Sequence, residues 1–161
     1  MAKIETKLKE LGIELPAPIK LPPGLTLPFS FVKTCGNRAY LSGHAPLNLD
    51  GSLAEPLGKV GAEVSVGQAT ELAKLTAVAM LSSLRRELGD LDRVTNWLRV
   101  LGMVNVAPGF NMTTPVVNGF SELIVEVYGP ERGSHTRSAV GMAVLPLDIA
   151  VEVEAEVEIA T

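Results

Sequence analysis

Cysteine is nearly absent from the chain, which carries a single one, Cys35, among 161 residues. One thiol excludes an intrachain disulfide framework and is typical of proteins that work in a reducing compartment. Aromatic residues are also scarce, at 4%. The 47% of hydrophobic residues therefore predicts a core built mainly from valine, leucine and alanine. A chain of this length has room for one domain that needs no covalent cross-link.

Clusters of lysine and arginine are missing as well, and the net charge is −4. This balance argues against a nucleic-acid partner, because such partners are bound through concentrated positive charge. No apolar run is long enough to span a membrane, and the charged start "MAKIETKLKEL" is unlike a signal peptide. We therefore expect a cytoplasmic protein without a membrane partner. A charged content of 20% is slightly low and favours an oligomer.

Metal-binding and nucleotide-binding motifs are lacking too. His44 and His135 stand far apart and have no partner at H-x-x-x-H or C-x-x-C spacing, so we expect no metal. The stretch "GHAPLNLDG" has no Gly-Lys-Ser/Thr signature, and no G-x-S-x-G elbow occurs. Cys35 is more typical of a small residue beside a turn than of a nucleophile.

The pattern of apolar residues predicts an N-terminal helix and a proline-rich connector over 1–27, followed by a single domain over 28–161. Within that domain the expected order is β-β-α-β-α-β-β, with the first two strands joined at Gly36-Asn37. This order predicts an α+β sandwich of one mixed sheet with two helices on one face.

Capping signals bound the two long helices. The first is expected over 66–88, between a capping box at Ser65 and Gln68 and a closing Gly89. The second is expected to begin at Thr114 as N-cap and to end at 129–130. Between them "DRVTNWLRVLGMVNVAP" predicts a long strand, with Gly102 as a possible bulge.

Arg137 opens the strand "SHTRSAVGMAV" and is the most informative polar residue of the chain. Alternate positions of a strand share a face, and Ala139, Gly141 and Ala143 are all small. Small residues beside an arginine leave space that another subunit or a ligand must fill. A solvated edge residue, half of an ion pair and an anion-binding group all remain open at this point.

The last strand, "VEVEAEVEI", alternates valine with glutamate and predicts an acidic face opposite an apolar one. If it forms a hairpin with the Arg137 strand around Leu147, Arg137 lies opposite about Val157. Glu152 then lies about 16 Å away along the sheet. Contact between Arg137 and Glu152 would require a neighbouring chain.

Four stretches, "NRAYLSGHAP", "GDLDRV", "VNGFSEL" and "TRSAVGMAVLPLDIAVEVEAEV", resemble the Rid family of reactive-intermediate deaminases, also called YjgF. Together they cover about residues 28 to 161. The last stretch is similar to the family signature, an R-S/A-x-V followed by L-P and V/I-E-V/I-E-A. The N-terminal extension and "NGFSEL" resemble the YjgF/chorismate-mutase-like or endoribonuclease L-PSP-like branch.

The resemblance implies a chorismate-mutase-like fold, a homotrimer, and ligand clefts between subunits. It implies hydrolysis of 2-imino or enamine carboxylic acids to 2-keto acids and ammonia, without a cofactor. By its implication Arg137 binds the substrate carboxylate and Glu152 orients the attacking water. Asn118 lines the cleft, and Ser42 and Gly43 turn backbone groups toward the ligand.

Three residues depart from the family pattern. Phe29 stands where a tyrosine is usual, Ala139 where a cysteine is usual, and His44 where a glutamine is usual. Loss of the tyrosine hydroxyl removes a hydrogen bond worth about 1–3 kcal/mol if it is buried. His44 either replaces the glutamine in the cleft or has a structural role.

Three functions follow from these residues. The first is a 2-iminobutanoate/2-iminopropanoate deaminase-like hydrolase. The second is a non-catalytic trimer that binds a small carboxylate, such as a 2-keto acid, as a sensor or regulator; Phe29 and Ala139 favour it. The third is the endoribonuclease or translation-inhibitor function named in some relatives, against which the acidic net charge argues.

Overall fold

A computed structural model describes residues 3–160, so the first two residues of the predicted N-terminal segment and the last residue of the predicted domain lie outside it. The helices and strands follow one another as α1 (Lys3–Glu10), β1 (Val32–Cys35), β2 (Arg38–His44), α2 (Val66–Leu88), η1 (Leu91–Arg93), β3 (Val94–Asn105), α3 (Thr113–Gly133), β4 (Thr136–Met142), η2 (Pro146–Asp148) and β5 (Val151–Ile159).

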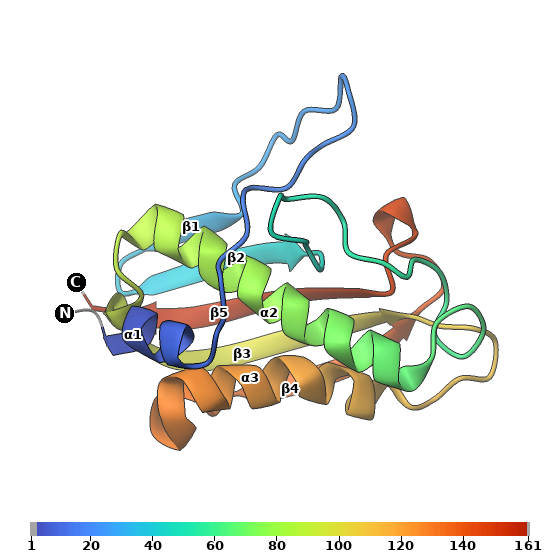
Figure 1. The fold of residues 1–161 in the computed structure, drawn as a ribbon. Helices are drawn as coiled ribbons and strands as arrows, with labels where there is room; N and C mark the ends of the chain where they lie inside the picture. Colours follow the sequence, from blue (N-terminus) through green and yellow to red (C-terminus); the bar gives the residue numbers. More distant parts are fainter. Residues whose placement is uncertain (1–2, 161) are drawn as a thin grey trace.

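The five strands form one mixed sheet in the order β1-β2-β5-β3-β4. Neighbours are antiparallel except β3 and β4, which are parallel. The long helices α2 and α3 lie side by side across one face (Figure 1). This confirms the predicted α+β fold with both long helices on a single face.

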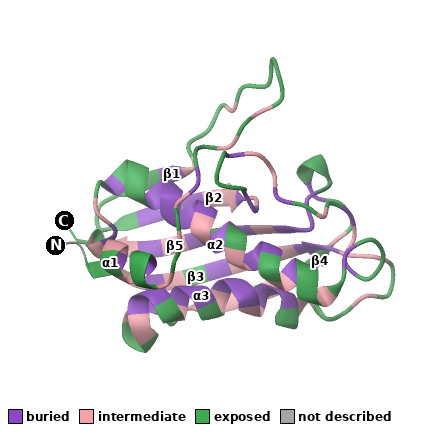
Figure 2. Cartoon of the chain, viewed as in Figure 1, coloured by how far each residue is buried: buried purple, intermediate pink, exposed green. Residues whose placement is uncertain are grey.

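The core lies between the two helices and the sheet, where the inward helix faces and the central strands are buried (Figure 2). Its largest fully buried side chains come from both layers and include Trp97, Phe120, Met80, Leu81, Leu84 and Ile124. The opposite face of the sheet has no helix over it in the described chain and carries exposed Tyr40 and Val140.

The capping box of α2 is confirmed. The Ser65 hydroxyl oxygen accepts a hydrogen bond from the Gln68 backbone N–H (3.2 Å), and the Gln68 side chain accepts one from the Ser65 N–H (2.9 Å). Gly89 ends the helix in the left-handed conformation at φ 79°. These bonds satisfy backbone groups that every helix terminus leaves without a partner.

The predicted start of α3 at Thr114 is wrong, whereas its predicted end at 129–130 coincides with a kink in the helix. The N-cap is Met112, which offers no side-chain hydrogen bond, and Thr113 instead donates its hydroxyl to the Ala139 carbonyl oxygen of β4 (3.1 Å). Gly129 kinks the helix at φ 80°, but helical backbone resumes after it as far as Gly133. Pro130 is compatible with this restart because proline suits the first turn of a helix.

The predicted bulge at Gly102 is also wrong, because Gly102 is paired with Ala139 on one side and Val153 on the other. The register shifts occur earlier in β3, between Val94 and Asn96 and between Trp97 and Arg99. The glycine instead allows α3 to approach, since a Cβ at this position would lie 2.4 Å from Val117 Cγ1.

The expected hairpin of the last two strands does not form, because β3 lies between β4 and β5. The connection from β3 through α3 brings the chain back as a strand parallel to β3 at the sheet edge, as helical crossovers do. Arg137 is therefore paired with Val100, which is paired in turn with Ala155.

The connector between α1 and β1 crosses α2 and then projects from the body of the protein in an exposed turn at Pro23-Gly24 (Figure 1). Before that turn it is held by hydrogen bonds from Ala17 N–H to Leu49 O (2.9 Å) and from the buried Ser82 hydroxyl to Pro16 O (2.6 Å). Among residues 3–160, none of the helices combines the length and the apolar character needed to cross a bilayer.

Candidate functional site

Arg137 lies on the helix-covered face of the edge strand β4. Its strand partner Val100 is fully buried on that face, and its Nη1 donates a hydrogen bond to the hydroxyl of Ser121 on α3 (2.9 Å). The guanidinium is half-buried, and desolvation lowers its pKa. The negative charge of Glu122 acts in the opposite direction but does not cancel this effect. No carboxylate of the described chain forms an ion pair with Arg137. Arg137 is thus a charged group with donors free for an anion.

Glu152 lies on the other face of the sheet. Its partner in β3 is Met103, and its side chain reaches across to β2, where a Cβ on Gly43 would come within 1.8 Å of Glu152 Oε1. Burial raises the pKa of Glu152, and the neighbouring charge of Glu154 raises it further. A carboxylate with a raised pKa is a better proton acceptor near neutral pH than an exposed one.

Arg137 and Glu152 do not meet within one chain. Through Val100 of β3, Arg137 is in register with Ala155 of β5. Ala155 is three residues from Glu152, a separation of about 10 Å along the strand. The two strands are also separated by β3, at about 4.8 Å per strand step, and the two side chains point to opposite faces. The chain therefore holds two half-sites, one at Arg137 and one at Glu152.

Ser42 and Gly43 lie beside Glu152, at an irregularity between Leu41 and His44 where the β2–β5 register shifts. The Ser42 hydroxyl donates to the Ser30 carbonyl oxygen (2.8 Å) and its N–H to Phe31 O (3.0 Å). The lack of a side chain at Gly43 is what gives the Glu152 carboxylate room on this face.

His44 points to the helix side of the sheet, away from Glu152. It is 3% exposed, its Nδ1 lies 2.7 Å from the Ser42 carbonyl oxygen, and its ring packs on Phe31 at 5.1 Å between centroids. Desolvation lowers the pKa of His44 to about 4, so the ring is neutral. His44 also borders a cavity of about 240 Å³ between the connector, β1 and the end of α2. Of the two roles that the sequence leaves open, this position suits the structural one.

The remaining predicted site residues fall around the two half-sites. Asn118 is half-buried on α3, three residues before Ser121 and therefore on the same helix face. Ala139 packs against the core two residues after Arg137. Phe29 is 52% exposed just before β1 and stacks edge-on against Phe31 at 5.7 Å between centroids.

Sequence reasoning missed two residues that contact or adjoin Arg137, namely Ser121 and His135. The Ser121 hydroxyl lies 2.9 Å from His135 Nε2 as well as from Arg137 Nη1. The signal was present in "SHTR", because a residue two positions before Arg137 shares its strand face. Ser121 gave no such signal, since only the α3–β4 packing brings it there.

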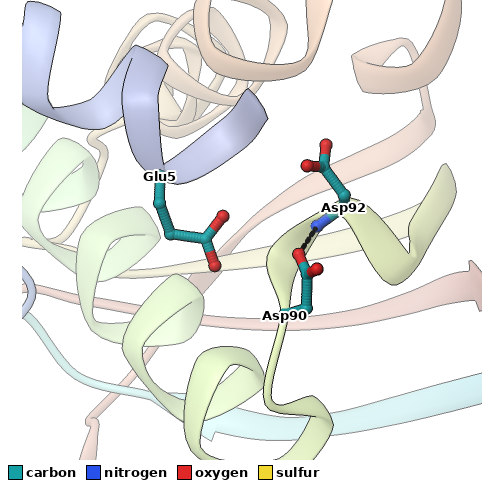
Figure 3. Close-up of side chains that lie close together, drawn as sticks. All are labelled: Glu5, Asp90 and Asp92. Carbon is teal, nitrogen blue, oxygen red and sulfur yellow. Dashed lines mark hydrogen bonds between the residues drawn. The ribbon is translucent and has the colours of Figure 1, made fainter. Parts of the chain in front are cut away.

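Three carboxylates from distant parts of the chain, Glu5, Asp90 and Asp92, have oxygens within 4.8 Å of one another (Figure 3). Several of their oxygens have partners in the described chain, although Glu5 Oε2 is buried without one. Glu5 accepts from the Leu91 N–H (3.1 Å) and pairs with Arg85 (3.0 Å), and Asp90 accepts from the Asp92 N–H (2.8 Å). This cluster fastens α1 to η1, and we assign it a structural role.

Comparison with known proteins extends over nearly the whole chain. Protein TCP17 of Trypanosoma cruzi is 38% identical over 157 residues, which cover 98% of this chain and 94% of that protein. The crystal structure of Atu1372 from Agrobacterium tumefaciens, a protein of unknown function, is 38% identical with a TM-score of 0.87, over 98% of this chain and 93% of that one. No family model matches the chain.

A candidate endoribonuclease from Shewanella oneidensis is 26% identical with a TM-score of 0.86, over 97% of this chain and 99% of its own. Escherichia coli TdcF, solved with bound serine, shares the fold at 17% identity and a TM-score of 0.59, over 89% and 99% of the two chains. The signature around Arg137, the order of elements and these relatives agree. The chain belongs to the Rid/YjgF family.

Proposed function

We propose that the protein is a hydrolytic deaminase of small 2-imino or enamine carboxylic acids, acting in clefts between the subunits of a homotrimer. The observation that carries this proposal is Arg137, a half-buried guanidinium that has no carboxylate partner in the described chain. A planar guanidinium matches a carboxylate through two parallel hydrogen bonds, so it can fix a small acid in position and orientation.

The placement of Glu152 supports a shared cleft. Its half-site lies on the opposite sheet face and two strands away from Arg137, so a second copy of the chain is needed to bring the two groups to one ligand. The sheet face without helices gives that copy a surface on which to pack, where exposed Tyr40 and Val140 lie among the glutamates of β5. TdcF, which shares the fold, was solved with serine, a small amino acid.

The chemistry asks little of the protein. Arg137 holds the carboxylate, and Glu152 accepts a proton from water as the water oxygen bonds to the imine carbon. Glu152 then returns this proton to the nitrogen. The hydroxyl proton of the tetrahedral adduct passes to the same nitrogen as the carbon–nitrogen bond breaks, so ammonia leaves and a 2-keto acid remains. Burial of Glu152 suits this role, because its raised pKa brings proton acceptance closer to neutral pH. The proposal places the reaction in the cytoplasm, where the exposed thiol of Cys35 stays reduced.

The test is a trapping assay in which 2-aminoacrylate is generated in the presence of semicarbazide. The wild-type protein should lower the rate of semicarbazone formation, and Arg137→Ala should abolish that effect. Unchanged trapping with wild-type protein, across imines made from several amino acids, would overturn the deaminase proposal.

A second function, carboxylate binding without turnover, is favoured by Ala139 and Phe29, which remove a thiol and a hydroxyl from positions where the family pattern has them. Calorimetry with 2-oxobutyrate, pyruvate and benzoate separates it from catalysis. Binding that is lost in Arg137→Ala, together with unchanged trapping by wild-type protein, would identify a sensor rather than an enzyme.

A further inference from the structure

The starting point is the hydrogen bonding of His135, which directly precedes β4. Its Nδ1 lies 2.7 Å from the Gly133 carbonyl oxygen, and its ring stands edge-on to Phe120 at 6.4 Å between centroids. A carbonyl oxygen only accepts hydrogen bonds, so Nδ1 must carry the ring proton. Desolvation lowers the pKa of His135, and this effect, together with the charge of Arg137, outweighs the opposite effect of the hydrogen bond to the Gly133 carbonyl. The ring is therefore neutral near pH 7, and Nε2 is an acceptor.

This protonation state sets the direction of the next two bonds. Because Nε2 of His135 can only accept a hydrogen bond, the Ser121 hydroxyl, 2.9 Å away, must donate its one proton to that nitrogen. The lone pairs of the Ser121 oxygen are then left for Arg137, whose Nη1 donates to them at 2.9 Å. The three hydrogen bonds thus form a continuous series with an assigned donor and acceptor at each step, which runs from Arg137 through Ser121 and His135 to the Gly133 carbonyl.

This series of hydrogen bonds contacts Arg137 at a single guanidinium nitrogen, Nη1. A guanidinium has five N–H donors, and Ser121 takes one of them. Glu122 of α3 is the charged group that acts on Arg137 from the packed helix, and it makes no ion pair with it in the described chain. Arg137 makes no other hydrogen bond to the described residues, so its remaining donors can serve a ligand.

We propose that Ser121 and His135 are positioning residues, which hold Arg137 in the orientation that binds the carboxylate of the ligand. This inference rests on the proposed function, because it assigns the two residues to the same anion site. A salt bridge to a protein carboxylate would hold the guanidinium as firmly, but would neutralise it and occupy the donors that the ligand needs. A neutral serine–histidine pair holds it without competing with the ligand.

The experiment is calorimetry of 2-oxobutyrate binding to the full chain as wild type, Ser121→Ala, His135→Ala and the double variant. Each single change should weaken binding about tenfold, because it removes or releases one hydrogen bond to a charged group. The double variant should bind 2-oxobutyrate as tightly as the single variant with the lower affinity, because the two residues act on Arg137 in series.

Two further variants separate positioning from folding. Ser121→Thr keeps the hydroxyl and should restore affinity to within about twofold of wild type. Thr136→Ala is the matched control, because it removes a different β4 hydrogen bond, from the Thr136 hydroxyl to Leu98 O (2.9 Å), and should leave affinity unchanged. Circular dichroism melts show which variants are folded at the temperature of the titration.

The variants test the positioning role, whereas the wild-type protein tests the proposed function, so the two can fail independently. If wild type binds 2-oxobutyrate and folded Ser121→Ala binds it equally well, the positioning role is overturned while the anion site stands. If Ser121→Thr is as weak as Ser121→Ala, the hydroxyl is not responsible and the inference is likewise overturned. A wild type that binds none of the carboxylates overturns the proposed site itself.

Discussion

Burial of the Glu152 carboxyl links stability to pH at the scale of a single residue. Its pKa is raised in the folded state, so the folded state binds the proton more tightly than the unfolded state does. The free energy of unfolding therefore falls as the pH rises from the ordinary carboxyl pKa through the raised one, and the penalty is complete above that interval.

We expect Glu152→Gln to raise the melting temperature near neutral pH and to leave it unchanged well below the ordinary carboxyl pKa. The same change should abolish deamination, because glutamine accepts no proton from water. Glu131→Gln, at an exposed position of α3, is the control and should alter neither property. A Glu152→Gln protein that is less stable than wild type near neutral pH would contradict this account of the burial.

At the scale of elements, Gly119 of α3 lies against the backbone of α2. A Cβ there would lie 2.2 Å from the Thr70 backbone oxygen of α2, which cannot move aside as a flexible side chain could. We expect Gly119→Ala to lower the free energy of unfolding by about 1–3 kcal/mol, as measured by urea denaturation. Gly67→Ala is the matched control, since nothing lies within 4 Å of its added Cβ. Equal stabilities of the two variants would show that the helices can separate without loss.

The elements that the sequence predicts best are those with local signals. The capping box at Ser65 and the left-handed Gly89 mark the ends of α2, because both depend on residues within a few positions. The pairing of the last two strands carries no such signal. A hairpin and a parallel return beside β3 are both compatible with "SAVGMAV", and packing of α3 decides between them.

The site follows the same division. Arg137 and Glu152 are singled out by the family signature. The small residues on the Arg137 strand face do not mark space for another subunit or a ligand, because Ala139 packs against the core and Gly141 lies against Val106 of the same chain. The relative placement of Arg137 and Glu152 could not be predicted, because it depends on the order of the strands and on the register with which β3 pairs with β4 and β5. Ser121 could not be identified either, since it reaches Arg137 only through the packing of α3 on β4.

For the whole molecule, the central consequence of the proposed function is that each chain carries two candidate half-sites, neither of which is complete alone. Arg137 faces α3 at the β4 edge, and Glu152 faces β2 on the uncovered side of the sheet. An assembly in which the Arg137 edge of one copy meets the Glu152 face of the next would close a complete site at each subunit boundary. Cyclic symmetry would repeat that contact around a ring.

Mixed assemblies of two inactive variants test this claim most directly. Arg137→Ala and Glu152→Gln should each be inactive when they are expressed separately. The two variants are then co-expressed with different tags, and trimers that contain both are purified. In each mixed trimer, about one cleft in three should combine an intact Arg137 from one variant with an intact Glu152 from the other. The account predicts that deamination of 2-aminoacrylate returns to about a third of the wild-type rate. Mixed trimers that form but stay as inactive as the separate variants would contradict it.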